Sequence, residues 1–91
     1  DKERGDVLIK VSRLNGEAAL FAPSPLMAET HSFDWLPEPG KFVAEADVDE
    51  LIRRRRQYDP DLWVIEIEDR EGRHFLTETV NGERGSPEIG R

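Results

Sequence analysis

The sequence predicts an α+β domain, with an antiparallel sheet of about five strands and one principal helix packed on one face. Two pairs of alternating apolar segments, each pair joined by turn residues, predict two β-hairpins. One amphipathic segment between them predicts the helix. A chain of 91 residues is long enough for one domain. We expect a flexible N-terminus at residues 1–5, the domain at 6–80, and a disordered tail at 81–91, where little can be buried.

The first hairpin is predicted at the start of the domain. Residues Asp6–Leu14 form the first strand, Asn15-Gly16 the turn, and residues Glu17–Ala22 the returning strand. Asn and Gly both tolerate positive φ, as a two-residue hairpin loop requires. This loop would pair Val11 with Leu20 and place both on one apolar face of the sheet.

A long loop at 23–40 is predicted from its prolines, which stand at positions 23, 25, 37 and 39. Proline removes an amide donor and restricts the residue before it, so we expect no central strand here. The stretch Leu26–Leu36 between these prolines has room for a short helix or turn. A short strand is expected next, at Lys41–Ala46.

The helix is predicted from a start signal, an apolar face and a stop signal. Asp47 is a favourable N-cap, and Glu50 three residues later completes a variant of the capping box. Asp59-Pro60 ends the helix, because proline disfavours helical geometry at the residue before it. The apolar face consists of Val48, Leu51 and Ile52.

The second hairpin is predicted after the helix. It comprises a strand at Asp61–Asp69, a turn at Arg70–Gly72 and a returning strand at His74–Val80. This arrangement would pair Glu68 with His74. The expected core face consists of Trp63, Ile65, Ile67, Phe75, Thr77 and Thr79.

Composition excludes several kinds of chemistry. There are no cysteines, so disulfides, thiolate nucleophiles and thiolate metal sites are absent. No nucleophile elbow and no glycine-rich phosphate loop occurs in the sequence. We therefore expect no enzyme activity, no catalytic residues, no metal and no cofactor. A chain without cysteine is compatible with the cytoplasm, where we expect it to reside.

The charge balance favours a basic protein partner. Twenty acidic and 13 basic side chains give a net charge of −7 at pH 7. This charge repels nucleic acid and anionic membranes at long range. The chain opens with Asp1 rather than Met, which suggests an excised domain or a processed chain.

Four consecutive arginines, Arg53–Arg56, stand out in this acidic chain. On a helix four consecutive side chains point around the axis and cannot form one patch. Asp49 and Glu50 lie four residues before the first two arginines, in a favourable orientation for ion pairs. Arg55 is directed toward the apolar face. We interpret the run as a solvated helix end.

The alternative is an anion or nucleic-acid site formed by Arg54, Arg55 and Arg56. A guanidinium suits carboxylates and phosphates. A nucleic-acid surface usually also contains lysines and stacking aromatics, and Tyr58 is the one aromatic residue close to the run. Nucleic-acid binding is therefore possible but disfavoured.

A histidine and three carboxylates share the other face of the predicted second hairpin. These residues are His74, Glu66, Glu68 and Glu78. They could bind a metal or act in acid–base chemistry. We favour ordinary cross-strand stabilisation on an exposed face, because nothing in the pattern provides a pocket.

Bulky residues within the 23–40 loop are the candidates for binding a protein partner: Met27, Phe33, Trp35 and Leu36. Alternatively, Phe33 and Trp35 fold back into the core, which is the reading we favour for these two, because a domain this small gains from burying large aromatics. The sequence thus favours a small acidic binding module that docks on a basic protein or on another part of a larger parent chain. Alternatives are nucleic-acid binding through the arginines and an inhibitor that mimics nucleic-acid charge.

Overall fold

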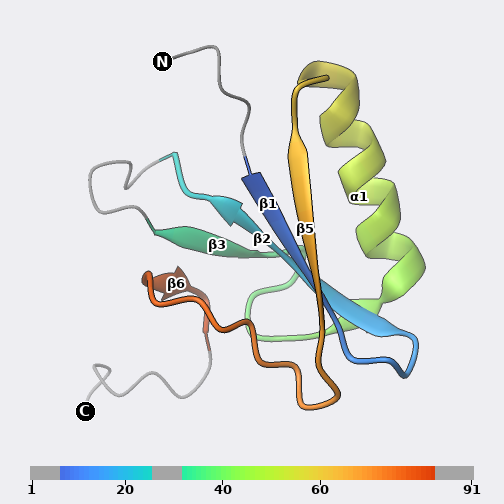
Figure 1. Ribbon diagram of the computed structural model, residues 1–91, viewed down its shortest axis with the longest axis vertical. Helices are drawn as coiled ribbons and strands as arrows, with labels where there is room; N and C mark the ends of the chain where they lie inside the picture. Colours follow the sequence, from blue (N-terminus) through green and yellow to red (C-terminus); the bar gives the residue numbers. More distant parts are fainter. Residues whose placement is uncertain (1–6, 26–31, 84–91) are drawn as a thin grey trace.

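The computed structural model describes residues 7–25 and 32–83, and Figure 1 shows how its elements are arranged. The predicted N-terminal segment, Met27 and the predicted tail from residue 84 onward lie outside these residues. The elements are β1 (Val7–Ser12), β2 (Glu17–Pro23), β3 (Phe33–Leu36), β4 (Val43–Ala44), α1 (Glu45–Tyr58), β5 (Trp63–Glu68) and β6 (Val80–Asn81). The predicted α+β class is confirmed. Asn81 belongs to β6, although the tail was predicted to begin there.

The sheet is mixed, so the prediction of an antiparallel sheet was wrong. Five of its six strands run in the order β5-β1-β2-β3-β6, and β4 pairs with β2. Strand β1 is antiparallel to β2, which is antiparallel to both β3 and β4. The pairs β1–β5 and β3–β6 are parallel. Helix α1 follows β4 directly and carries the chain back, so β5 runs in the same direction as β1 (Figure 1).

The first hairpin forms as predicted, but its register differs by one residue. Val11 lies opposite Ala19 instead of the predicted Leu20. The Arg13 amide donates to the Glu17 carbonyl at 2.9 Å, so the loop has three residues and not two. A shift of one residue exchanges the two faces of a strand. Because both faces of this hairpin are apolar, the side-chain pattern does not distinguish the two registers.

The core has two parts, one on each face of the sheet. The part under α1 consists of Leu8, Ala18, Leu20, Ala22, Val48 and Leu62. The part on the opposite face consists of Ile9, Val11, Ala19, Phe21, Trp35 and Val80. Strands β1 and β2 are therefore buried on both sides.

Helix α1 begins two residues before the predicted cap at Asp47. No side chain caps its first turn, and the Glu45 amide instead donates to the Gly16 carbonyl of the first hairpin at 2.8 Å. Tertiary packing thus supplies the acceptor that we had assigned to Asp47. The helix ends at Tyr58, as the Asp59-Pro60 signal predicted. None of the helices in the described ranges is long and apolar enough to span a membrane.

Residues 33–36 form a strand inside the sheet, although the proline-rich segment 23–40 was predicted to contain none. β3 lies between β2 and β6. Its four residues fit between the flanking prolines, with Pro23 at the end of β2 and Pro37 directly after β3. Proline therefore limited the length of this strand and did not prevent it.

The predicted second hairpin does not form. β5 and the turn at Arg70–Gly72 are present, and Gly72 has φ 78°. The chain then leaves the sheet and crosses the face opposite α1 to reach β6, which pairs with β3 (Figure 1). Glu68 therefore lies opposite Ser12 of β1, not opposite His74.

The predicted core face of that hairpin is largely exposed. Trp63, Ile65 and Phe75 are 68%, 51% and 64% exposed. The buried positions are Leu62 and Val80, which do not belong to the predicted core face. Trp63 and Ile65 stay exposed because no returning strand pairs with β5 in the described part of the chain.

Candidate functional site

β5 has an edge that pairs with no other strand of the described residues. It is the first strand of the sheet, and β1 pairs with it on one side. The Asp69 amide, directly after β5, donates to the Ser12 carbonyl of β1 at 2.9 Å. Successive peptide groups of a strand point to alternate sides, so the amides of Val64, Glu66 and Glu68 point away from β1. The outer edge of β5 thus offers three backbone donors in a row.

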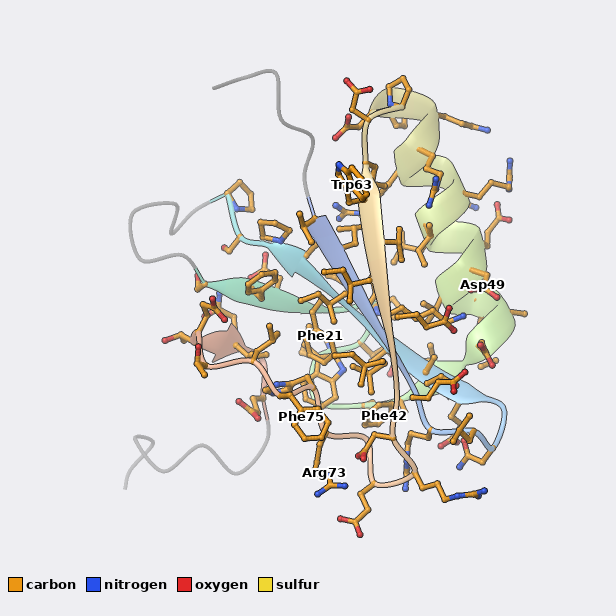
Figure 2. All side chains as sticks on the ribbon, viewed as in Figure 1. Phe21, Phe42, Asp49, Trp63, Arg73 and Phe75 are labelled. Carbon is orange, nitrogen blue, oxygen red and sulfur yellow. The ribbon has the colours of Figure 1, made fainter. Side chains whose placement is uncertain are left out.

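Three exposed apolar side chains lie beside this edge, on the face of the sheet opposite α1. Trp63 and Ile65 project from β5, and Val7, 36% exposed, lies opposite Trp63 in β1. Figure 2 shows Trp63 near the start of β5, far from Phe75. Phe75 belongs to residues 73–79, which cross the sheet to reach β6 and which we call the crossing segment. We call Val7, Trp63, Ile65 and the outer edge of β5 the open β5 surface.

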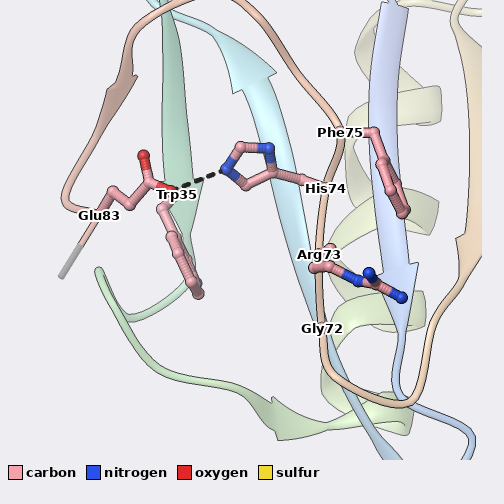
Figure 3. Close-up of a pocket in the computed structure, with 6 residues that line it drawn as sticks. All are labelled: Trp35, Gly72, Arg73, His74, Phe75 and Glu83. Atoms are coloured by element: carbon pink, nitrogen blue, oxygen red, sulfur yellow. Dashed lines mark hydrogen bonds and ion pairs between the residues drawn. The ribbon is translucent and has the colours of Figure 1, made fainter. Parts of the chain in front are cut away.

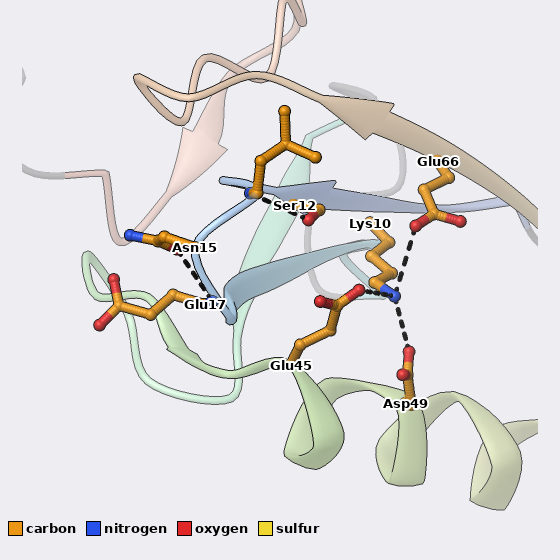
Figure 4. A network of polar contacts seen from close by, with 8 residues as sticks. Lys10, Ser12, Asn15, Glu17, Glu45, Asp49 and Glu66 are labelled. Carbon is orange, nitrogen blue, oxygen red and sulfur yellow. Dashed lines mark hydrogen bonds and ion pairs between the residues drawn. The ribbon is translucent and has the colours of Figure 1, made fainter.

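The face of the sheet that packs under the start of α1 is acidic beside β5. A buried lysine lies there, Lys10 of β1, and its ammonium is 2.7 Å from Glu45, 2.8 Å from Asp49 and 3.4 Å from Glu66 (Figure 4). Burial alone would lower the pKa of Lys10. Hydrogen bonds to the Asp49 and Glu45 carboxylates outweigh burial and raise this pKa above its ordinary range.

The charges of this cluster do not cancel. Three carboxylates surround one ammonium, and all three are partly exposed to solvent. Glu68, the next residue on the same side of β5, is also exposed. The α1 side of the β5 edge therefore carries excess negative charge. The sequence did not reveal this cluster, because its members come from three elements far apart in the chain.

A pocket of about 370 Å³ lies where the crossing segment passes over the sheet (Figure 3). Its lining residues are Trp35, Gly72, Arg73, His74, Phe75 and Glu83. Glycine is required at position 72, since a Cβ there would lie 2.6 Å from the Phe42 ring. Phe75 has φ 59°, which is rare for a bulky residue.

His74 is held by contacts at both ring nitrogens. Its Nδ1 accepts the Leu76 amide at 2.9 Å, so the proton of the neutral ring resides on Nε2. Nε2 lies 3.0 Å from the Glu83 carboxylate (Figure 3). The ring also meets Phe21 edge-on. Neither nitrogen is free for a substrate or a metal. No group of three residues suited to hold a metal ion occurs in the parts of the chain that the structure describes.

The predicted cluster of His74 with carboxylates therefore does not assemble. Glu66 lies beside Lys10, and the carboxylate beside His74 is Glu83. Arg73 also has a partner, because the Asp69 carboxylate accepts its backbone amide and its guanidinium, each at 2.7 Å. Within the pocket His74 and Glu83 thus satisfy each other, and Arg73 is held by Asp69 outside it.

The predicted docking residues occupy different environments. Trp35 is 7% exposed, and its indole N–H donates to the Lys41 carbonyl at 2.8 Å. It is a core residue, which is the reading that the sequence favours for it. Phe33 and Leu36 are half-buried and pack against opposite parts of the core. Met27 lies outside the described residues.

The arginine run is partly neutralised by its own helix. Glu50 accepts hydrogen bonds from Arg53 at 3.1 Å and from Arg54 at 3.3 Å. The predicted partner of Arg53, Asp49, pairs with Lys10 instead. Arg55 is half-buried and Arg56 is exposed, and neither forms an ion pair within the described residues.

Comparison with known proteins places the chain in a family. The chain is similar to a protein of known structure described as the crystal structure of a DUF1491 family protein from Caulobacter crescentus CB15. The two are 44% identical, with a TM-score of 0.64, and the match covers 85% of this chain and 70% of that one. The comparison with curated proteins gave no match. The model of the family described as "Protein of unknown function (DUF1491)" matches residues 1–77. The chain belongs to the DUF1491 family.

Proposed function

We propose that this domain is a protein-binding module whose partner docks on the open β5 surface. One observation carries the proposal: Trp63 is 68% exposed on a strand whose outer edge is unpaired within the described residues. Tryptophan is enriched among the residues that dominate binding energy at protein interfaces. An edge strand with exposed apolar side chains also risks aggregation, so a binding role gives a reason for these residues.

Burial elsewhere in the domain supports this interpretation. Phe21, Leu8 and Leu20 are fully buried, so the core forms without Trp63. Covering a large apolar side chain contributes about 1.5–3 kcal/mol, which a partner would gain at Trp63 and again in part at Ile65. The site differs from the one expected within residues 23–40, where Trp35 belongs to the core.

The partner is proposed to be basic. The net charge of −7 speeds encounter with a positively charged surface, while apolar contacts at Trp63 and Ile65 slow dissociation. We propose binding and not catalysis, because both ring nitrogens of His74 already have partners. A cytoplasmic location suits a chain without cysteine.

A selection from a random peptide library tests the proposal. The immobilised domain is used to select peptides, and each is then measured against a variant with Trp63→Ser and Ile65→Thr. We expect selected peptides to bind this variant at least about tenfold more weakly, the equivalent of losing about 1.4 kcal/mol of apolar contact.

The matched control is Tyr58→Ser, which removes an aromatic ring that is 89% exposed at the end of α1. It should leave binding unchanged. Circular dichroism and urea denaturation establish that all variants are folded. Peptides that bind the Trp63/Ile65 variant as tightly as the wild type would refute the proposed site.

A further inference from the structure

We infer that the partner contributes an extended strand to the outer edge of β5, with basic residues alternating with apolar ones. The inference rests on the proposed function and specifies the chemistry of its partner. The backbone of β5 supports the addition of a strand. Its open face supports the apolar residues of that strand, and its acidic face supports the basic ones.

The backbone of β5 is ready for strand addition. Its six residues contain no proline, and the amides of Val64, Glu66 and Glu68 point to the edge that is unpaired among residues 7–25 and 32–83. A regular strand pairs with such an edge through main-chain hydrogen bonds, independent of its own sequence. Natural edges are often protected by proline, a bulge or charged side chains. β5 has no proline and no bulge, and its charges, Glu66 and Glu68, would attract a basic strand.

The two faces of β5 set the pattern of the added strand. Side chains of the partner on the open face would lie beside Trp63 and Ile65, so they should be apolar. Those on the α1 face would lie beside Glu66 and Glu68, close to the surplus carboxylates around Lys10. Lysine or arginine is the complementary choice there. Side chains of a strand alternate between faces, so the two requirements give an alternating sequence.

A second copy of this chain fits the same edge less well. Self-association would bring together two chains that each carry a net charge of −7. Antiparallel pairing of two β5 strands centred on Glu66 would also place Glu66 beside the Glu66 of the other copy. Charge complementarity therefore selects a basic strand from another protein.

Two synthetic peptides test the inference. The first is a blocked octapeptide in which lysine alternates with valine between terminal glycines, and the second has glutamate in place of lysine. NMR titration of the labelled domain gives the affinity of each, and hydrogen exchange reports the amides of Val64, Glu66 and Glu68. We expect the lysine peptide to bind and to slow exchange at these three amides. The glutamate peptide should bind at least about tenfold more weakly.

A pair of variants isolates the backbone contribution. Glu66→Pro removes both the outward amide and the carboxylate, and Glu66→Gln removes only the charge. Proline is tolerated on an edge where the amide faces solvent. We expect the lysine peptide to bind Glu66→Pro up to about tenfold more weakly than Glu66→Gln, because one main-chain hydrogen bond is lost.

The possible outcomes separate the inference from the proposed function. Failure of the lysine peptide to bind, or equal affinity for the two Glu66 variants, overturns strand addition. If peptides selected from the library still need Trp63 and Ile65 in order to bind, the proposed protein-binding function stands although strand addition is refuted. If Glu66→Pro does not fold, the test is amide hydrogen exchange at Val64, Glu66 and Glu68 in the peptide-bound wild type. Exchange that the peptide does not slow refutes the inference.

Discussion

At the scale of single residues, Asp69 determines where the chain goes after β5. Its carboxylate binds the backbone amide and the guanidinium of Arg73, and its carbonyl accepts the Gly72 amide at 2.9 Å. These bonds close the turn away from the sheet, and Phe75 follows with positive φ. Alternation of side chains suggested a returning strand, but it carries no information about this turn. That is why Trp63 and Ile65 were predicted to be buried.

Replacing Asp69 by Asn should destabilise the domain in a pH-dependent way. The side-chain hydrogen bond from Arg73, followed by the one from its backbone amide, lowers the pKa of Asp69 to about 2. A carboxylate with a depressed pKa stabilises the fold above its unfolded pKa of about 3.9, and this contribution disappears as pH falls through 2. Urea denaturation should show wild type more stable than Asp69→Asn at pH 7, with the difference closing between about pH 4 and 2. A control, Asp61→Asn, should show no such closing, and a difference that persists below pH 2 would contradict the role of this carboxylate.

At the scale of elements, Lys10 connects β1, α1 and β5 through a single ammonium group (Figure 4). Lys10→Met would leave three carboxylates close together with no cation between them. Breaking a fully buried ion pair costs about 3–5 kcal/mol, and partial exposure of the carboxylates reduces this to about 1–3 kcal/mol. Because the pKa of Lys10 is raised, its contribution is complete throughout the neutral range and is lost only in strong alkali.

Urea denaturation of Lys10→Met at pH 7 measures this contribution, and we expect a loss of stability of about 1–3 kcal/mol relative to wild type. Lys41→Met is the matched control, since Lys41 is exposed, and it should change stability by less than about 0.5 kcal/mol. A Lys10→Met variant as stable as this control would show that the cluster contributes nothing to folding.

The elements themselves were more predictable than their pairing. Local signals located β1, β2, α1 and β5, because turn residues, apolar periodicity and the Asp59-Pro60 stop act within a few residues. Pairing of β5 with β1 joins residues more than 50 positions apart, such as Val7 and Trp63. No short-range pattern distinguishes that contact from a hairpin. The open β5 surface exists only because of this pairing, so sequence reasoning could not find it.

At the scale of the whole molecule, negative charge surrounds the arginine run and opposes nucleic-acid binding. The domain carries 20 acidic side chains, and Glu50 pairs with both Arg53 and Arg54. Binding to nucleic acid depends on neutralising its phosphates, and the net charge of −7 repels a nucleic acid that approaches the domain from a distance. Arg55 and Arg56 remain as the cations without an ion pair in this run, within the described residues.

Reversal of these two charges, Arg55→Glu with Arg56→Glu, tests whether the run serves nucleic acid or the fold. We expect wild type and variant alike to show no binding to a fluorescent single-stranded oligonucleotide at physiological salt, by anisotropy. We also expect a change in stability of about 1 kcal/mol or less, because Arg56 is exposed and Arg55 is only half-buried. If wild type instead binds the oligonucleotide, with an affinity that falls with salt and disappears in the variant, the arginines form a nucleic-acid site. The lysine-containing peptide should bind wild type and variant about equally, because its predicted contacts are with Glu66 and Glu68 on β5.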